Sequence, residues 1–285
     1  MIILIQILIK YVLFAKFYLT LSLDDFHFAI LVLSTVLIAL AGYIVNDLND
    51  IRADKINKPK RVFVGKLITK QKADNLFLIF NFLGLLLGYY LSYSIDEISF
   101  FSIFIIASLL SYLYSIKLKK MLIFKNLIVS FLVFLSILIV GLYDIVPASS
   151  AYNNQSQFDV FNLVFKISVF AFLLTLLREI VKDIEDVKGD KAIGIKSLPL
   201  VMSINMVKII IYVIAVLTLV SIDYFAFTLY KINYIASLYL LIVVSIPLLY
   251  FMVRIYKSKT KSEFNKLSNL LKIIMFLGIL TIFVL

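Results

Sequence analysis

The sequence contains no cysteine and a single histidine, His27, among its 285 residues. The absence of cysteine excludes disulfide bonds, thiolate metal sites and cysteine nucleophiles, and one histidine cannot form a histidine-based metal cluster. Charged residues are also scarce, at 16% of the chain, compared with roughly 25% in soluble domains. Any ionic or metal site must therefore be built from a small set of carboxylates, amides and basic side chains.

Long apolar runs take the place of the missing charge. The mean hydropathy is +1.06, and apolar runs recur that are long enough to cross roughly 30 Å of hydrocarbon. Unbroken runs of this length favour helices over a barrel, whose strands would alternate. We predict an all-α polytopic membrane protein, with residues 1–285 forming one membrane domain. Its nine predicted spans are residues 1–22, 28–46, 73–94, 98–116, 122–143, 159–180, 202–221, 234–253 and 268–285.

Lysine and arginine are distributed unevenly between the connections that join these spans. Of the 28 basic residues, 24 lie in or beside the connections after spans two, four, six and eight. Cytoplasmic loops of membrane proteins carry such an excess of positive charge. We therefore predict that these connections and the N-terminus are cytoplasmic. The net charge of +11 follows from this bias, and we expect membrane lipids, with no nucleic acid, among the partners.

Two acidic segments 136 residues apart share one pattern, IVNDLNDIRADK (44–55) and IVKDIEDVKGDK (180–191). Six of their twelve positions are identical, including every aspartate. The first acidic row is Asp47, Asp50 and Asp54, and the second acidic row is Asp183, Asp186 and Asp190. Both rows follow even-numbered spans, and an offset of four spans gives those spans the same direction across the membrane. The chain is therefore predicted to contain a parallel internal repeat.

The spacing of the aspartates in each row suggests a cation site. Steps of three and four residues place side chains on one face of a helix. Neighbouring carboxylates oppose each other's ionisation, so such a row is more stable beside a cation. Carboxylates and the Asn46 amide are hard oxygen donors, which favour Mg²⁺, or Mn²⁺ in its place, together with phosphate oxygens. Two such rows with basic neighbours indicate a diphosphate that is held through metal ions.

At these residues the sequence resembles the UbiA superfamily of intramembrane prenyltransferases. The family pattern N-D-x-x-D-x-x-x-D after the second helix is matched from Asn46 to Asp54, and a second aspartate motif after the sixth helix is matched from Asp183 to Asp190. Other matching segments are GYIVND, DKINKPKR, YSIKLKK, and REIVKDIEDVKGD followed by SLP. The resemblance covers nearly the whole chain. It implies nine helices around a central cavity that opens laterally to lipid, with a cap over the cytoplasmic mouth.

The resemblance also implies a reaction and its residues. The reaction is Mg²⁺-dependent transfer of a polyprenyl group from prenyl diphosphate to a membrane-associated lipid or aromatic acceptor, on the cytoplasmic side. The implied metal ligands are Asn46, Asp50, Asp54, Asp183, Asp186 and Asp190. The implied substrate-binding residues are Asp47, Arg61, Lys117, Arg178 and Lys182. Tyr114, near the reacting carbon, and Lys119, on phosphate, are the implied catalytic residues.

The sequence departs from the family pattern in two places. Relatives usually have a short segment before the first helix, whereas this sequence starts inside that helix, so we expect a truncated start or a lost segment. Many relatives also place a tyrosine and a lysine four residues apart after span four. Here Lys117 follows Tyr114 by three residues and Lys119 follows it by five, so both lysines stay candidates for the phosphate contact.

An aromatic wall could stabilise an allylic cation through its ring faces. Tyr43, Tyr112 and Tyr114 are the candidates, and ordinary packing or anchoring at the membrane interface is the alternative for each of them.

The acceptor and the class of function have alternatives. The segment REIVKDIEDVKGD is most similar to the branch that resembles geranylgeranylglycerol-phosphate geranylgeranyltransferase, which makes ether lipids, and this branch indicates a prokaryotic cell membrane. Aromatic quinone precursors and tetrapyrroles are the alternative acceptors. A membrane transporter is the alternative class, because parallel repeats and intramembrane polar sites occur there too. Transport sites usually lie near the bilayer midplane, however, whereas both acidic rows are predicted at the cytoplasmic rim.

Lys10 places a charge inside the first predicted span, one turn after Gln6. A charge within a membrane span favours a functional role by default. A lysine whose ammonium reaches the membrane interface is the alternative.

Overall fold

The computed structural model describes residues 1–57, 62–192 and 194–285. Every regular element over these ranges is a helix, and the β pairing there is limited to one bridge between Val64 and Ile68. Eight of the described helices are long and apolar enough to cross a membrane. The prediction of an all-α polytopic membrane protein is therefore confirmed.

The spanning helices each overlap one of the predicted spans, from the second to the ninth. They are α2 (Asp25–Asn57), α3 (Lys70–Ser94), α4 (Phe101–Ile116, after the 3-10 turn Ile98–Phe100), α5 (Phe124–Asp144), α6 (Asn154–Ala192), α8 (Ile204–Leu229), the continuous run α9, η5 and α10 (Tyr234–Tyr239, Leu240–Ser245 and Ile246–Lys257), and α11 (Lys261–Leu280, followed by the 3-10 turn Thr281–Phe283). Two of them, α2 and α6, continue past the apolar sequence and through the acidic rows. Each row is therefore carried on rigid helix.

The first predicted span differs from the structure. Residues 1–22 do not form one long helix. The helix there consists of α1 (Ile2–Leu8) and the π-helical η1 (Ile9–Phe14), and it is too short to count among the eight helices that could cross a membrane. Tyr18 has a left-handed backbone with φ of 51°. The Leu19 amide donates to the Phe14 carbonyl and the Tyr18 amide to the Ala15 carbonyl, which is the hydrogen-bond pattern of a Schellman helix end. This turn directs the chain towards α2.

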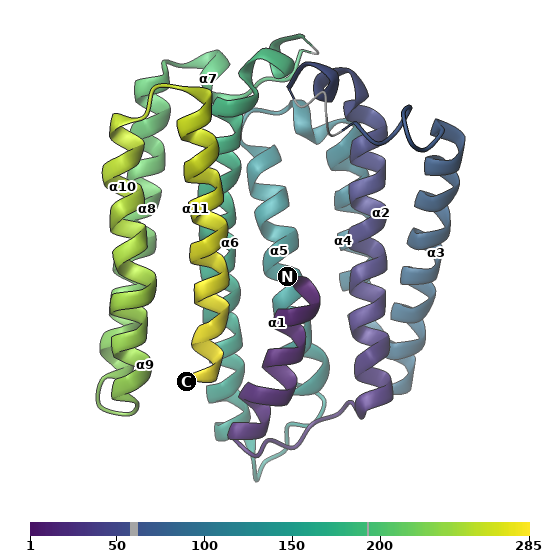
Figure 1. Ribbon diagram of the computed structural model, residues 1–285. Helices are drawn as coiled ribbons and strands as arrows, with labels where there is room; N and C mark the ends of the chain where they lie inside the picture. Colours follow the sequence, from purple (N-terminus) through teal and green to yellow (C-terminus); the bar gives the residue numbers. More distant parts are fainter. Residues whose placement is uncertain (58–61, 193) are drawn as a thin grey trace.

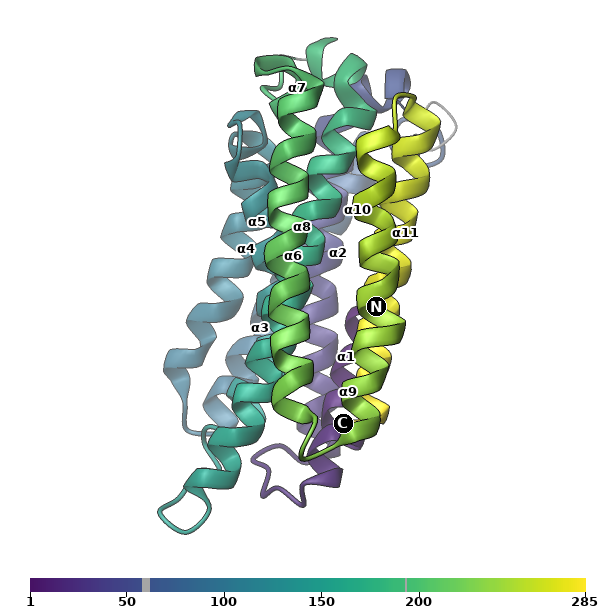
Figure 2. The same ribbon diagram turned by 90° about the vertical axis from the view of Figure 1, so that its left-hand side faces the viewer.

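The helices stand side by side in a bundle (Figure 1). Helix α2 packs against α3, α4 and α6, whereas α6 packs against α5, α8 and α11. Both views place α7 (Leu198–Val201) at the upper end of the bundle, where α6 ends (Figure 2). A Cβ atom on Gly84 would lie 2.7 Å from the Ile38 side chain, so this glycine allows α2 and α3 to approach closely. The two longest helices, α2 and α6, thus form the centre of the structure.

A buried ion pair fastens the opposite end of the bundle. Lys10 and Asp144, whose side chains are 4% and 0% exposed, lie 3.0 Å apart between Nζ and Oδ2. Lys10 also donates to the Leu23 carbonyl at 2.7 Å, and the Leu23 amide donates to Asp144 at 3.0 Å. The pair therefore joins η1, the end of α5 and the segment before α2. The Lys10 ammonium group is buried in this ion pair, and its partners indicate a role in stability.

We expect Lys10→Met to destabilise the fold by roughly 3–5 kcal/mol, because it leaves Asp144 buried without its counter-ion. The free energy of unfolding in detergent measures the effect. Lys16→Met is the matched control, because Lys16 belongs to the same segment but is exposed, and it should change little. Replacing both partners, as Lys10→Met with Asp144→Leu, should recover much of the loss. Equal unfolding of Lys10→Met and Lys16→Met would contradict this account.

Candidate active site

Both acidic rows line one cavity of about 330 Å³ at the upper ends of α2 and α6. The periodicity of the helices explains the convergence, since steps of three and four residues turn every member of a row to one face. The cavity is lined by Asn46, Asp47, Asp50, Ala53, Asp54 and Asn57 of α2, by Glu179, Lys182, Asp183, Asp186 and Asp190 of α6, by Lys125 and Asn126 of α5, and by Phe63, Tyr114, Lys119 and Ile195. Residues far apart in sequence thus meet in one polar chamber.

Asn57 fixes the distance between the two rows. Its side-chain Nδ2 donates to the Asp186 carbonyl at 3.1 Å, and its Oδ1 accepts from the Gly189 amide at 3.0 Å. A Cβ atom at position 189 would overlap the Asn57 side chain. Gly189 therefore permits α2 and α6 to approach closely where the acidic rows face each other.

Two buried lysines neutralise carboxylates in both rows. Lys119 Nζ lies 2.5 Å from Asp50 Oδ1 in the first row. Lys125 Nζ lies 2.7 Å from Asp183 Oδ1 and 3.2 Å from Asp190 Oδ2 in the second. Asn126 adds a hydrogen bond from Nδ2 to Asp183 Oδ2 at 3.0 Å. Burial of charge is tolerated where ions are paired and hydrogen bonded in this way.

Glu179 forms a separate charge cluster beside the second row. Its carboxylate accepts from Lys182 at 2.9 Å and from Arg178 at 2.9 Å. Lys182 and Glu179 line the cavity, whereas Arg178 is outside its lining. Glu179 accepts hydrogen bonds from both cations. This carboxylate therefore acts as a counter-ion that positions Lys182.

The structure separates the two lysines that were candidates for the phosphate contact. The 3-10 turn Leu118–Lys120 follows α4 and changes the direction of the chain. Lys119 is consequently buried in the cavity wall, whereas Lys117 is exposed and is not part of the lining. Lys119 is the lysine placed to meet a ligand in the cavity, and Arg61 lies outside the described residues.

Among the three candidate tyrosines, only Tyr114 lines the cavity. Tyr43 is 67% exposed on α2. Tyr112 is 42% exposed and stacks on Phe77 with ring centroids 5.9 Å apart. The geometry therefore leaves Tyr114 as the candidate for contact with a reacting carbon, and ordinary packing or interface anchoring describes the other two.

The donor set of the cavity fits a divalent metal that is bound together with a diphosphate. All the candidate ligands are hard oxygen donors, which suit Mg²⁺. Asn46 Oδ1 is buried and has no hydrogen-bond partner among the described residues, so one amide oxygen is available as a ligand. Over the described part of the chain, no three carboxylates or histidines lie close enough to hold a metal ion alone. Phosphate oxygens would have to complete the coordination, and the assignment of individual ligands stays a prediction.

Lys125, Asn126 and Asn57 are polar residues of the cavity that were not among the predicted site residues. Lys125 and Asn126 lie at the start of the predicted span 122–143, where such residues are ordinarily read as a solvated terminus. Asn57 lies beyond the predicted span 28–46, at the end of α2 in the structure. Their roles depend on which helices are neighbours, because Lys125 and Asn126 reach from α5 to aspartates on α6. The adjacent pair Lys-Asn at the start of an apolar span was the one signal in the sequence.

Comparison with known proteins connects this cavity to a family. Residues 8–280 match the sequence model of the UbiA prenyltransferase family. A digeranylgeranylglyceryl phosphate synthase of Methanobrevibacter smithii is 31% identical over 234 residues, which cover 81% of this chain and 77% of that protein. The enzyme of the same name from Saccharolobus solfataricus is 32% identical over 247 residues, which cover 86% of this chain and 79% of that protein.

Solved structures show the same architecture. A structure described as that of digeranylgeranylglyceryl phosphate synthase has a TM-score of 0.66 and 27% identity, and the match covers 99% of this chain and 96% of that chain. A UbiA homologue from Archaeoglobus fulgidus, bound to DMAPP and Mg²⁺, has a TM-score of 0.61 and 17% identity, with 100% and 97% of the two chains covered. At this level of identity the second likeness concerns the fold alone.

We expect Gly189→Ala to disturb the meeting of α2 and α6. Alanine normally stabilises a helix relative to glycine by roughly 0.5–1 kcal/mol, but here its methyl group would overlap Asn57, and such overpacking costs typically about 1–3 kcal/mol. A net loss of thermal stability in detergent should follow. Gly278→Ala is the matched control, since no atom lies within 4 Å of a Cβ there. If both variants were equally stable, Asn57 and Gly189 would not set the separation of the rows.

Proposed function

This chain belongs to the UbiA prenyltransferase family, and from that membership we propose that it transfers a polyprenyl group from its diphosphate to a glycerol-phosphate lipid. The reaction would be a step in the synthesis of ether lipids. The observation that carries the proposal is one cavity in which two helix ends present acidic rows, each paired with a buried lysine. The names of the relatives at 31% and 32% identity support the choice of acceptor.

The donor diphosphate would be held through Mg²⁺ by Asn46, Asp50, Asp54, Asp183, Asp186 and Asp190. The bound metal supplies positive charge that stabilises the departing diphosphate. The presence of DMAPP and Mg²⁺ in the homologue from Archaeoglobus fulgidus supports this assignment. Asp47 lies at the start of the first row and would help to orient the bound diphosphate from the same helix face.

Lysine side chains would exchange partners when the substrate arrives. Lys119 and Lys125 hold carboxylate oxygens in the structure, and both can turn their ammonium groups towards phosphate oxygens in the same cavity. As the bond between the allylic carbon and the diphosphate oxygen breaks, the electron pair leaves with the diphosphate. Lys119, Lys125 and Lys182 then stabilise the growing negative charge.

Tyr114 and the acceptor complete the reaction. The face of the tyrosine ring would stabilise the allylic cation. A hydroxyl oxygen of the glycerol-phosphate lipid then forms the new bond to that carbon, and its proton passes to an oxygen of the released diphosphate. The buried setting limits the access of water, which would otherwise capture the cation.

The location of the site follows from the charge bias. The cavity lies at the end of the bundle where the connections rich in lysine and arginine lie, and such connections stay in the cytoplasm. We therefore place the active site on the cytoplasmic side. The organisms in which the relatives occur support a prokaryotic cell membrane.

An assay of the purified protein with labelled geranylgeranyl diphosphate and Mg²⁺ tests the proposal. We expect a prenylated product with geranylgeranylglycerol phosphate and none with 4-hydroxybenzoate. EDTA, or Asp50→Ala combined with Asp186→Ala, should lower turnover by about two orders of magnitude or more, because the metal stabilises charge by several kcal/mol. Asp74→Ala is the control, since Asp74 is exposed on α3.

Undiminished turnover in EDTA or in the double variant would refute the metal-assisted mechanism. If only 4-hydroxybenzoate gave a prenylated product, the acceptor would be an aromatic quinone precursor instead of a glycerol-phosphate lipid.

Lys125 gives a second test, with a readout that does not depend on turnover. Lys125→Met removes the cation beside Asp183 and Asp190, so the metal-free protein should lose roughly 3 kcal/mol of stability. Mn²⁺ should bind at least about tenfold more tightly, because no internal cation competes for those carboxylates. Unfolding in EDTA and Mn²⁺ titration by electron paramagnetic resonance measure the two effects.

Lys120→Met is the control for that experiment, because Lys120 belongs to the same segment but is exposed. Unchanged or weaker Mn²⁺ binding by Lys125→Met would show that Lys125 does not compete with the metal.

A further inference from the structure

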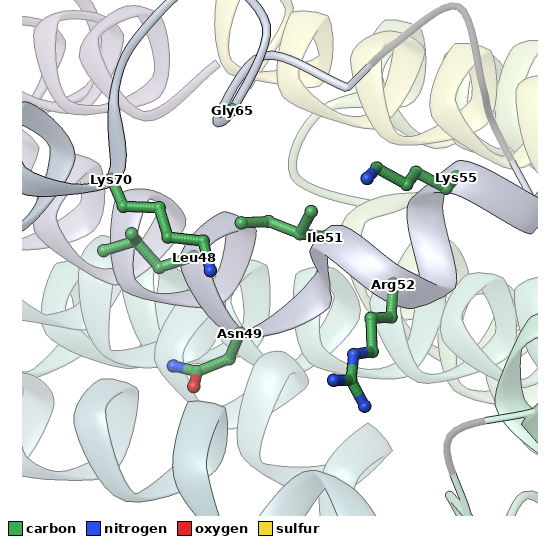
Figure 3. A pocket seen from close by; sticks show the side chains of 7 residues that line it. All are labelled: Leu48, Asn49, Ile51, Arg52, Lys55, Gly65 and Lys70. Carbon is green, nitrogen blue, oxygen red and sulfur yellow. The ribbon is translucent and has the colours of Figure 1, made fainter.

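A second cavity, of about 470 Å³, lies on the other face of α2 (Figure 3). It is lined by Leu48, Asn49, Ile51, Arg52, Lys55, Gly65 and Lys70. None of these residues lines the active-site cavity. On a helix with 3.6 residues per turn, Leu48, Ile51 and Lys55 lie opposite the side that carries Asn46, Asp50 and Asn57. One helix therefore separates an acidic chamber from a basic one.

The charges in this basic pocket lack counter-ions. Arg52, Lys55 and Lys70 are exposed, and over the described residues none of the three has an ion-pair or hydrogen-bond partner for its side chain. The lining also contains no acidic residue. Arg52 and Lys55 are three residues apart on one helix, where like charges repel. By contrast, Lys119, Lys125 and Lys182 in the active-site cavity all contact carboxylates. The basic pocket is therefore arranged for an anion.

The chemistry of the lining points to phosphate. An arginine fork and two ammonium groups on one small pocket match the oxygens of a phosphate group. Figure 3 shows Arg52 and Lys55 projecting from α2 in different directions, with Lys70 reaching in beside Leu48 from the start of α3. The carbon side chains of Leu48 and Ile51 form an apolar floor next to these cations. Phosphate beside an apolar surface is the combination that a lipid headgroup presents.

The position of the pocket favours a membrane lipid as the source of that phosphate. The pocket lies where α2 leaves its apolar section, and Leu67 and Ile68 are 76% and 37% exposed in the adjoining segment. Basic side chains just beyond a membrane span attract anionic lipids. We propose that Arg52, Lys55 and Lys70 bind the phosphate of an anionic membrane lipid, at a site distinct from the prenyl-transfer cavity.

Binding at this site would reach the active site through one short segment. Gly65 lines the basic pocket, whereas Phe63, two residues earlier, lines the active-site cavity. The segment between them is a tight turn, in which the Gly65 amide donates to the Ile68 carbonyl at 2.7 Å and φ of Gly65 is 85°. A lipid phosphate held across α2 and α3 would lie beside this turn, which carries Phe63 into the lining of the active-site cavity.

Native mass spectrometry of the full-length protein in neutral detergent, titrated with phosphatidylglycerol, tests the site. The triple variant Arg52→Gln, Lys55→Gln and Lys70→Gln should bind the lipid about 100-fold more weakly, since each cation contributes roughly fivefold near a charged surface. The matched control is Lys257→Gln, Lys259→Gln and Lys266→Gln, which removes the same charge from exposed positions at the same end of the bundle. It should bind as the unmodified protein does.

A charge-conserving variant, with Arg52→Lys, Lys55→Arg and Lys70→Arg, should retain binding and shows that the effect is not a loss of folding. Equal weakening in both neutralised triple variants would overturn the site in favour of general surface charge. Binding of inorganic phosphate without phosphatidylglycerol binding would overturn the lipid assignment. Because the readout is lipid binding, it is independent of whether the protein transfers prenyl groups.

Discussion

The balance between carboxylates and internal cations at the ends of α2 and α6 is the constraint on which the rest of the structure depends. Six aspartates line one small cavity, and ionised groups this close repel each other strongly at low dielectric. Lys119 contacts Asp50 of the first row and Lys125 contacts Asp183 and Asp190 of the second, so each row has an internal cation that offsets its charge. In the proposed function, the same lysines would turn to the diphosphate when a metal binds their carboxylates. A single set of charges would then serve stability and substrate binding in turn.

Rigid helices convert this charge balance into a defined geometry. The acidic rows lie on uninterrupted helix, and Asn57 and Gly189 set how closely the two helices approach. At the other end of the bundle, Lys10 and Asp144 hold η1 against α5. Helix α5 thus takes part in buried ion pairs at both ends, through Lys125 at its start and Asp144 at its end. These two ion pairs restrain the position of α5 along the axis of the bundle.

The helical fold was accessible from sequence because apolar runs and basic connections are local signals. The acidic rows were also accessible, because a repeat of Asp-x-x-Asp-x-x-x-Asp marks a helix face without knowledge of its neighbours. The residues that pair with these acidic rows could not be predicted from the sequence. Lys125, Asn126 and Asn57 act across helices, and no spacing within the chain indicates which helices meet. The contrast between Lys117 and Lys119 depends on a 3-10 turn of three residues, which hydrophobic periodicity does not predict. The short first helix depends likewise on Tyr18, an unusual residue for a left-handed turn.

The two faces of α2 explain why one helix should carry charges of both signs. A row of aspartates alone would make its end strongly negative, and this end already carries the negative pole of the helix dipole. Arg52 and Lys55 on the opposite face offset that charge without lining the active-site cavity, whereas Lys119 lies in that cavity. Cations placed there remain free to meet the membrane surface. The segment from Phe63 to Gly65 lines both cavities. A ligand in the basic pocket would therefore lie next to the segment that forms part of the active-site cavity. If both proposals hold, one rigid helix would carry a membrane lipid on one face and the ligands of the metal and diphosphate on the other.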